Sequence, residues 1–445
     1  MNLKDIDSSK SSGILCVALI VFISSISFSQ RPVPAKPQTK RILLMNGIAH
    51  LGNGKVIPNS VIGFKDGKFT LVADATVIRI DMTQFDTVIN IAGKHVYPGF
   101  IAVNSMLGLT EVGAVRATHD AGDVGTYNPE LRSVIAYNTD SKITPTTRTN
   151  GILLAQVCPK GGIISGTSSV MELDGWNWED AVYKMDDGVH LNWISMNNQS
   201  FNEDGEPGKS DKNSNYQKQK NELIKFFEDS KAYAQSTPIE KDLRFEAMRG
   251  IFDGSKTLYI HVSYVKEIID AVSFYKTSSV KKMVLVQARD AWMVTDLLKE
   301  NNIPVVLMAT HELPARAEDD VDLPYKMPYL LQKGGVLFCL SNSDGSEPMQ
   351  MRNLPFLAGT AAAYGLTKEE ALQSITFNAA KILGIDNRTG TLENGKDATF
   401  FVSTGDALDM KTNNLEIAFI RGKKLDLNNE QKELYERYKG KYNLK

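Results

Sequence analysis

The middle of the chain alternates between strand-like and helical segments, and this alternation limits the possible folds more than any other feature. Residues 281–286 and 303–308 contain apolar, β-branched runs that are typical of buried strands. Between them, residues 290–301 carry apolar side chains at helical spacing. Strand, helix and strand in this order form a parallel pair joined by a crossover. At 445 residues the chain is long enough for a barrel of about 250 residues built from such units, with a smaller module beside it.

Both ends of this region are rich in short strands and turns. Residues 41–97 contain runs of β-rich sequence separated by turns such as Asp66-Gly67, a typical hairpin pair. Neither this segment nor residues 385–428 supplies enough strands to bury a core alone. We therefore predict an α/β fold with a TIM-like (β/α)8 barrel over residues 98–384 and a composite β-sandwich from residues 41–97 and 385–428.

The N-terminal sequence is typical of a signal peptide. Lys4 and Lys10 precede an apolar run, residues 14–23, which is too short to span a bilayer comfortably. We expect residues 1–29 to be cleaved after Ser29 and residues 30–40 to form a linker. The mature protein would then be periplasmic or extracellular and free of the membrane. An uncleaved anchor is the alternative.

Composition excludes some partners and disulfide frameworks. The net charge of −2 suggests neither nucleic acid nor an anionic membrane surface as a partner. After signal cleavage the chain would hold only Cys158 and Cys339, both in apolar, strand-like contexts. We expect buried free thiols there rather than a disulfide.

A series of short sequence phrases resembles the amidohydrolase superfamily, in particular its imidazolonepropionase-like, exported bacterial branch. The resemblance covers roughly residues 41–425. It implies the barrel and the two-ended β-sandwich, and hydrolysis of a carbon–nitrogen bond other than a peptide bond by a metal-activated water. It also implies a small amide-type substrate and one divalent ion such as zinc. The phrases are Tyr97–Ile101, Arg148–Ile152, Ile164–Thr167, Leu173–Asp180, Asn353–Phe356, Ala363–Leu372, Ile375–Lys381 and Gly395–Ala398.

The resemblance implies metal ligands that this chain carries only in part. In the family the first barrel strand gives two histidines, and the fifth and sixth strands give one each. Here the first-strand positions are Asn104 and Met106, and the sixth-strand region, residues 286–290, has no histidine. His261 matches the fifth-strand position. It is therefore either a metal ligand or a residual, substrate-facing histidine.

The family's proton-shuttling aspartate lies at the end of the eighth strand. Asp344 is the candidate for this catalytic position, although a turn aspartate before Gly345 is the simpler interpretation. The register could also differ by a small shift that places Asn342 there. Asn104, Met106 and Asn342 are then candidates for lining the substrate pocket.

Further candidates lie in other segments. His311 follows a barrel strand, and Arg289 follows another, so both would lie on the functional face. Trp176 would line a pocket or simply pack. His119, with the neighbouring Asp120 and Asp123, would form an unorthodox metal site or a solvated polar loop.

Three functions follow from this pattern. The first is a superfamily member with weak or lost metal-dependent activity, a pseudoenzyme. The second is an active exported amidohydrolase that uses His261 and Asp344 with substitute ligands such as His119 or His311. The third is a non-catalytic binding or partner subunit, in a homo- or hetero-oligomer with a related, intact amidohydrolase.

Overall fold

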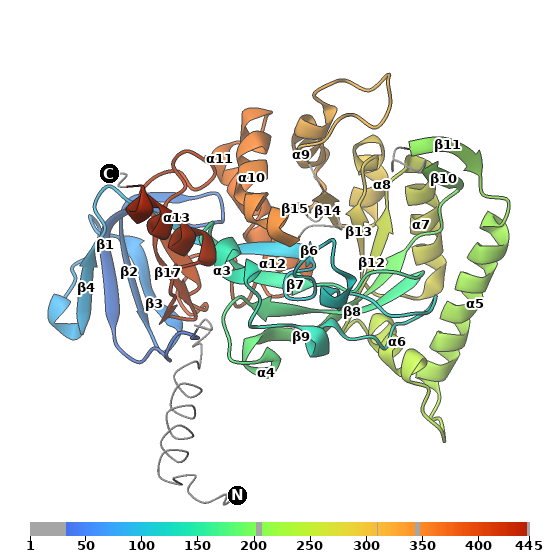
Figure 1. The fold of residues 1–445 in the computed structure, drawn as a ribbon, viewed down its shortest axis with the longest axis horizontal. Helices are drawn as coiled ribbons and strands as arrows, with labels where there is room; N and C mark the ends of the chain where they lie inside the picture. The colour runs from blue at the N-terminus through green and yellow to red at the C-terminus, as the bar shows by residue number, and fades with distance from the viewer. Residues whose placement is uncertain (1–32, 202–206, 309, 343–347, 443–445) are drawn as a thin grey trace, which may run out of the picture. The chain divides into compact units, whose positions relative to one another are not determined.

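The computed structural model describes residues 33–201, 207–308, 310–342 and 348–442 (Figure 1). Residues 34–445 form one unit, and the following description concerns it. The predicted signal peptide and Asp344 lie outside the described residues. No helix in the described ranges is long and apolar enough to cross a membrane.

Eight strands form the nearly closed barrel sheet that the sequence predicts. In the sheet they follow the order of the chain from β6 to β15, and β8 alone runs against its neighbours. The seam between the two edges is bridged where Ser341 Oγ donates to the carbonyl oxygen of Val103 at 2.7 Å. The strands are β6 (Phe100–Ser105), β7 (Ile152–Val157), β8 (Ile164–Glu172), β9 (Val182–Asn192), β12 (Thr257–Val262), β13 (Met283–Gln287), β14 (Val305–Met308) and β15 (Phe338–Ser341).

The reversal of β8 is a departure from the regular (β/α)8 pattern. Its last residue, Glu172, pairs with Leu154 near the start of β7. The chain therefore leaves β8 at the amino ends of the parallel strands, not at their carboxyl ends. This direction decides where the segment after β8 lies.

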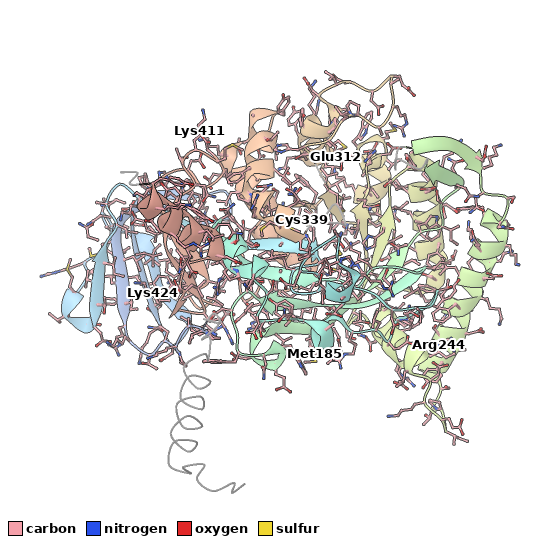
Figure 2. The ribbon with its side chains drawn as sticks, in the orientation of Figure 1. Met185, Arg244, Glu312, Cys339, Lys411 and Lys424 are labelled. Atoms are coloured by element: carbon pink, nitrogen blue, oxygen red, sulfur yellow. The ribbon has the colours of Figure 1, made fainter. Side chains whose placement is uncertain are left out.

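The crossover predicted over residues 281–308 is confirmed as β13, the 3-10 helix η3 (Ala291–Val294), α8 (Thr295–Glu300) and β14. Cys158 and Cys339 are buried free thiols, as expected, and Cys339 lies on β15 (Figure 2). The remaining helices are α2 (Ser133–Ala136), α3 (Ile143–Arg148), α4 (Trp178–Ala181), α5 (Tyr216–Gln235), α6 (Leu243–Asp253), α7 (Val265–Ser278), α9 (Leu323–Gly334), α10 (Leu354–Ala363), α11 (Lys368–Ser374), α12 (Phe377–Leu383) and α13 (Glu430–Lys441). A hairpin of β10 (Asn197–Phe201) and β11 (Pro207–Lys212) precedes α5.

Both ends of the chain contribute to one further β-sheet. Val96 pairs with Val402 in antiparallel register, so the strand before the barrel joins a strand after it. The C-terminal strands consequently lie beside the N-terminal ones (Figure 1). The strands are β1 (Ile42–His50), β2 (Val56–Lys65), β3 (Lys68–Asp74), β4 (Thr87–Asn90), β5 (His95–Pro98), β16 (Phe400–Ser403), β17 (Leu415–Ile420) and β18 (Lys423–Lys424).

Buried charges join this sheet to the barrel. Glu172, at the end of β8, is fully buried and pairs with Arg421 at 2.6 Å and with Lys423 at 3.7 Å. Tyr183 on β9 donates to Asp397 Oδ2 at 2.6 Å. A buried ion pair is costly to break because the remaining charge is left without a partner.

Candidate functional site

Polar side chains meet at the carboxyl ends of the barrel strands. In barrels of this kind the active site lies at that end. Asn104 and His261 lie one residue before the ends of β6 and β12, His190 lies two residues before the end of β9, and Lys160 follows β7. These four residues come from separate segments of the barrel and define the candidate site.

Two imidazoles hydrogen-bond to each other across β9 and β12. His190 Nδ1 lies 2.9 Å from His261 Nε2, so one nitrogen donates and the other accepts. His190 is fully buried and stacks on Tyr259 at 4.7 Å between ring centroids. Burial, with a smaller contribution from the Lys160 ammonium, lowers the pKa of His190 to about 3. The same causes hold the pKa of His261 well below its usual range, so both rings are neutral at neutral pH.

Asn104 lies at an irregularity of the backbone. Its φ is +56°, in the left-handed region, and the register between β6 and β7 shifts at this point. The backbone N–H of Asn104 therefore has no regular partner on the neighbouring strand and donates instead to Gln156 Oε1 at 3.1 Å. The Asn104 side chain accepts from Lys160 Nζ at 3.3 Å and lies 3.5 Å from the sulfur of Met308.

The same irregularity affects the surroundings of Met106. In a regular strand Asn104 and Met106 would face the same way. With Asn104 in the left-handed region the alternation is broken, and Met106, 6% exposed, packs in the larger hydrophobic cluster with Leu107 and Leu109. No contact joins Met106 to the two imidazoles among the described residues.

His190 and Lys160 were not predicted from the sequence as site residues. His190 stands in a short apolar run, where a histidine is more often a core residue than a functional one. Lys160 follows Cys158-Pro159, where nothing in the local pattern marks it. A sequence signal existed only for His190, since it lies near the end of a strand-like run, residues 187–192, as His261 does in residues 257–262.

Two cavities open beside the site. The smaller, of about 170 Å³, is lined by residues that follow β12, β13 and β14 and by Met308. The predicted residue Arg289 lines it and pairs with Glu312 at 2.9 Å; Glu312 is labelled in Figure 2. The larger cavity, of about 720 Å³, shares Asp290 with the smaller one. Asp290, 1% exposed, accepts from Arg316 and from the backbone N–H of Val265 at 3.0 Å.

The structure places other predicted residues away from the two imidazoles. His311 contacts Thr360 of α10 and lines a separate cavity of about 470 Å³. His119 is exposed and bonds to the carbonyl oxygen of Val112 within its own loop. Asn342 donates to the carbonyl oxygen of Gln350. Trp176 is 69% exposed and follows β8, which exits at the amino ends of the parallel strands, whereas the two imidazoles lie near the carboxyl ends.

The described donor set does not fit a hydrolytic zinc. Such a centre takes three protein ligands from histidine and carboxylate side chains and leaves a position for water. In residues 33–201, 207–308, 310–342 and 348–442 no group of three or more His, Cys, Asp or Glu side chains could hold a metal ion. Two imidazoles are present, but an ammonium, an amide and a thioether accompany them. The ammonium repels a divalent cation, and a thioether prefers soft ions.

Part of the chain is similar in sequence to known proteins. A model of the amidohydrolase family matches residues 260–425. Over 56 residues the chain is 48% identical to imidazolonepropionase of Shewanella frigidimarina (strain NCIMB 400), which covers 13% of this chain and 13% of that protein. Over 73 residues it is 41% identical to imidazolonepropionase of Shewanella baltica (strain OS185), covering 16% and 18%. These relatives are therefore matched over only a small part of their own lengths.

Solved structures share the fold over most of the chain. An amidohydrolase from Thermotoga maritima MSB8 superposes with a TM-score of 0.74 at 22% identity, covering 86% of this chain and 99% of that one. A zinc-bound adenosine deaminase from Xanthomonas campestris gives a TM-score of 0.51 at 15% identity, covering 91% and 98%.

The family match and the structural comparison agree with each other. Residues 260–425 match the amidohydrolase family, and most of the chain shares its fold with a solved amidohydrolase. The barrel and the extra β-sheet are consistent with the resemblance that the sequence indicates.

Proposed function

We propose that this protein has lost the ordinary zinc-dependent hydrolysis of its superfamily and binds a small amide-type molecule at the carboxyl ends of its barrel strands. The observation that carries this proposal is the environment of the two imidazoles. His190 and His261 hydrogen-bond to each other, and the Lys160 ammonium contributes to lowering the pKa of both rings.

Metal-dependent hydrolysis needs a divalent ion to lower the pKa of water and to polarise the carbonyl. The ion in turn needs ligands that carry or share negative charge. Asn104 occupies a first-strand ligand position, and the residue after β13 is Ala288. Both positions lack an imidazole, so the ion would lose contacts on two sides of the barrel.

What remains suits recognition by hydrogen bonds. Neutral imidazoles each offer one N–H and one acceptor nitrogen. Asn104 adds an amide, and Gln287 and Arg289 line the adjacent cavity. An amide ligand presents a carbonyl acceptor and an N–H donor, which such a set can satisfy.

The test is the metal content of protein purified without chelators. We expect less than stoichiometric zinc and no turnover of N-acyl amino acids, dipeptides or cyclic amides, with His261→Ala binding as little zinc as the parent. Stoichiometric zinc that is lost in His261→Ala would overturn the proposal.

One observation favours a second function, an active enzyme with substitute ligands. His190 brings a second imidazole within 2.9 Å of His261, whereas His119 and His311 contact other residues. This alternative expects turnover that His261→Ala, His190→Ala and Asp344→Asn each abolish. Unchanged turnover in all three would end it.

Export and association are part of the proposal as well. We propose that residues 1–29 direct the chain out of the cytoplasm, which N-terminal sequencing of the mature protein tests by an expected start at Gln30. A pairing with an intact, histidine-bearing homologue is tested by co-purification, and a lone monomer in light scattering would count against it.

A further inference from the structure

The ammonium of Lys160 has no anionic partner in the described chain. Its Nζ donates to the amide oxygen of Asn104 at 3.3 Å, and no carboxylate forms an ion pair with it. The side chain is largely withdrawn from water, and this burial lowers the pKa of its amine. Lysine is seldom buried without a counter-charge, because a desolvated cation costs several kcal/mol unless a charge or hydrogen bonds compensate it.

The groups around Lys160 are donors and neutral rings rather than acids. Both imidazoles are uncharged near neutral pH, and the buried Nε2 of His190 has no hydrogen-bond partner. The buried carboxylate of Asp187 is already used, since it accepts from Ser168 Oγ at 2.8 Å, Gln156 Nε2 at 2.8 Å and Tyr259 OH at 3.0 Å. The site therefore carries one positive charge that nothing described in the barrel neutralises.

We propose that Lys160 anchors a carboxylate group of the bound ligand, with the Asn104 amide and the imidazole N–H groups as additional donors. This inference rests on the proposed function, because it assigns the mouth of the barrel to an organic anion instead of a zinc ion. A single negative charge matches the single ammonium. Two oxygens in one plane can each accept from a different donor.

Space for the rest of the ligand lies next to this anchor. The Asn104 side chain contacts the sulfur of Met308, and Met308 lines the cavity of about 170 Å³. Lys160, Asn104 and Met308 therefore form a row that leads from the ammonium to the cavity. A small carboxylic acid with an amide or another short polar tail has the size and chemistry that this row accommodates.

Titration of the chelator-treated wild-type protein with sodium acetate, and with acetamide as its neutral isostere, tests the inference. We expect saturable binding of acetate and about tenfold or greater weakening with acetamide, because a charged hydrogen bond contributes more than a neutral one. Lys160→Met should weaken acetate binding by about tenfold or more, and Lys160→Arg by less.

Lys256→Met is the matched control. Lys256 is also partly buried, with its pKa lowered by burial, but it donates to the carbonyl oxygen of Ala247 at 3.1 Å and precedes β12, at the opposite end of the barrel. The acetate affinity of the Lys256→Met protein should equal that of the wild type. Melting curves show whether each variant is folded, and the comparison of acetate with acetamide in the wild type needs no variant.

Four results would overturn the inference, and they separate it from the proposed function. Absence of saturable acetate binding, or equal binding of acetate and acetamide, contradicts the anchor while leaving the loss of zinc chemistry intact. Equal acetate affinity in Lys160→Met and the wild type also contradicts the anchor and leaves the loss of zinc chemistry intact. Acetate binding that appears only after zinc is added contradicts both proposals, since the metal would then hold the anion.

Discussion

His190 Nδ1 and His261 Nε2 lie 2.9 Å apart on neighbouring barrel strands, with their ring planes tilted by 50°. Each ring provides the other with a partner in a place that water hardly reaches. The pair therefore has a structural role whether or not the site binds a ligand, and its protonation couples the site to the stability of the fold.

The first prediction concerns acid. The pKa of a histidine in the unfolded chain is about 6.5, whereas the pKa of His190 in the folded state is about 3. The unfolded state thus binds more protons, and the free energy of unfolding falls as the pH drops from about 6.5 towards 3. In His190→Gln this dependence should be shallower by roughly 1 kcal/mol per pH unit over that interval. Urea unfolding at a series of pH values measures it, and an unchanged slope would contradict the low pKa.

The second prediction concerns Asp187 inside the barrel. Asp187 is 1% exposed and accepts hydrogen bonds from three side chains. Asp187→Ala leaves those donors without an acceptor, so we expect a loss of about 3–5 kcal/mol in the free energy of unfolding. Glu228→Ala, at an exposed position of α5, should change it by less than about 0.5 kcal/mol. A small loss in Asp187→Ala would mean that water replaces the carboxylate.

The third prediction concerns the junction of the barrel and the β-sheet. Arg421→Met removes the closer cation from the buried Glu172, and we expect a loss of roughly 2–3 kcal/mol because Lys423 remains. Adding Glu172→Gln should restore part of this loss, as a double-mutant cycle by chemical denaturation would show. Additive effects would argue that the two side chains do not interact.

The fourth prediction uses Glu172 alone. Burial, opposed by the two cations, raises the pKa of Glu172 to about 7 from a usual value of 4.5. Because the folded protein keeps this proton longer than the unfolded chain, Glu172 contributes stability below pH 4.5 that is lost as the pH rises to about 7. The Glu172→Gln protein should therefore lose less stability over this interval than the wild type. Thermal unfolding at pH 4.5 and pH 7 compares them, and parallel curves would contradict the raised pKa.

The fifth prediction concerns the segment after β14. Arg316 pairs with the buried Asp290, and Arg289 pairs with Glu312, so two ion pairs hold this segment over the smaller cavity. Arg316→Ala leaves Asp290 with the Val265 N–H alone. We expect thermolysin to cleave beside the exposed Leu313 about tenfold faster, since about 1.4 kcal/mol of local stability is lost. Arg289→Ala, which breaks a more exposed pair, should have a smaller effect.

Local sequence pattern accounts for much of the fold. The apolar runs in the middle of the chain become barrel strands, and the two β-rich ends meet in one sheet through the pairing of Val96 with Val402. His261 lies on the fifth strand of the barrel sheet, as the resemblance implied. These features follow from the spacing of apolar residues along the sequence, because this spacing predicts which side chains are buried.

The site was less predictable because its members are far apart in the chain. Asn104 and Lys160 are separated by 56 residues, and His190 and His261 by 71. The surroundings of Met106 depend on a single left-handed residue, Asn104, and the location of Trp176 depends on the direction of β8. No short-range pattern encodes either feature.

The sequence by itself determined the α/β class and the absence of histidine from the first-strand positions, and it indicated the superfamily resemblance, because each depends on residue types in a known order. Only the tertiary structure decided that His190 faces His261, that Lys160 reaches Asn104 with no carboxylate partner among the described residues, and that β8 runs backwards. Strand direction, backbone conformation at a bulge and the meeting of buried charges depend on contacts between distant segments. Those contacts form only when the whole barrel closes.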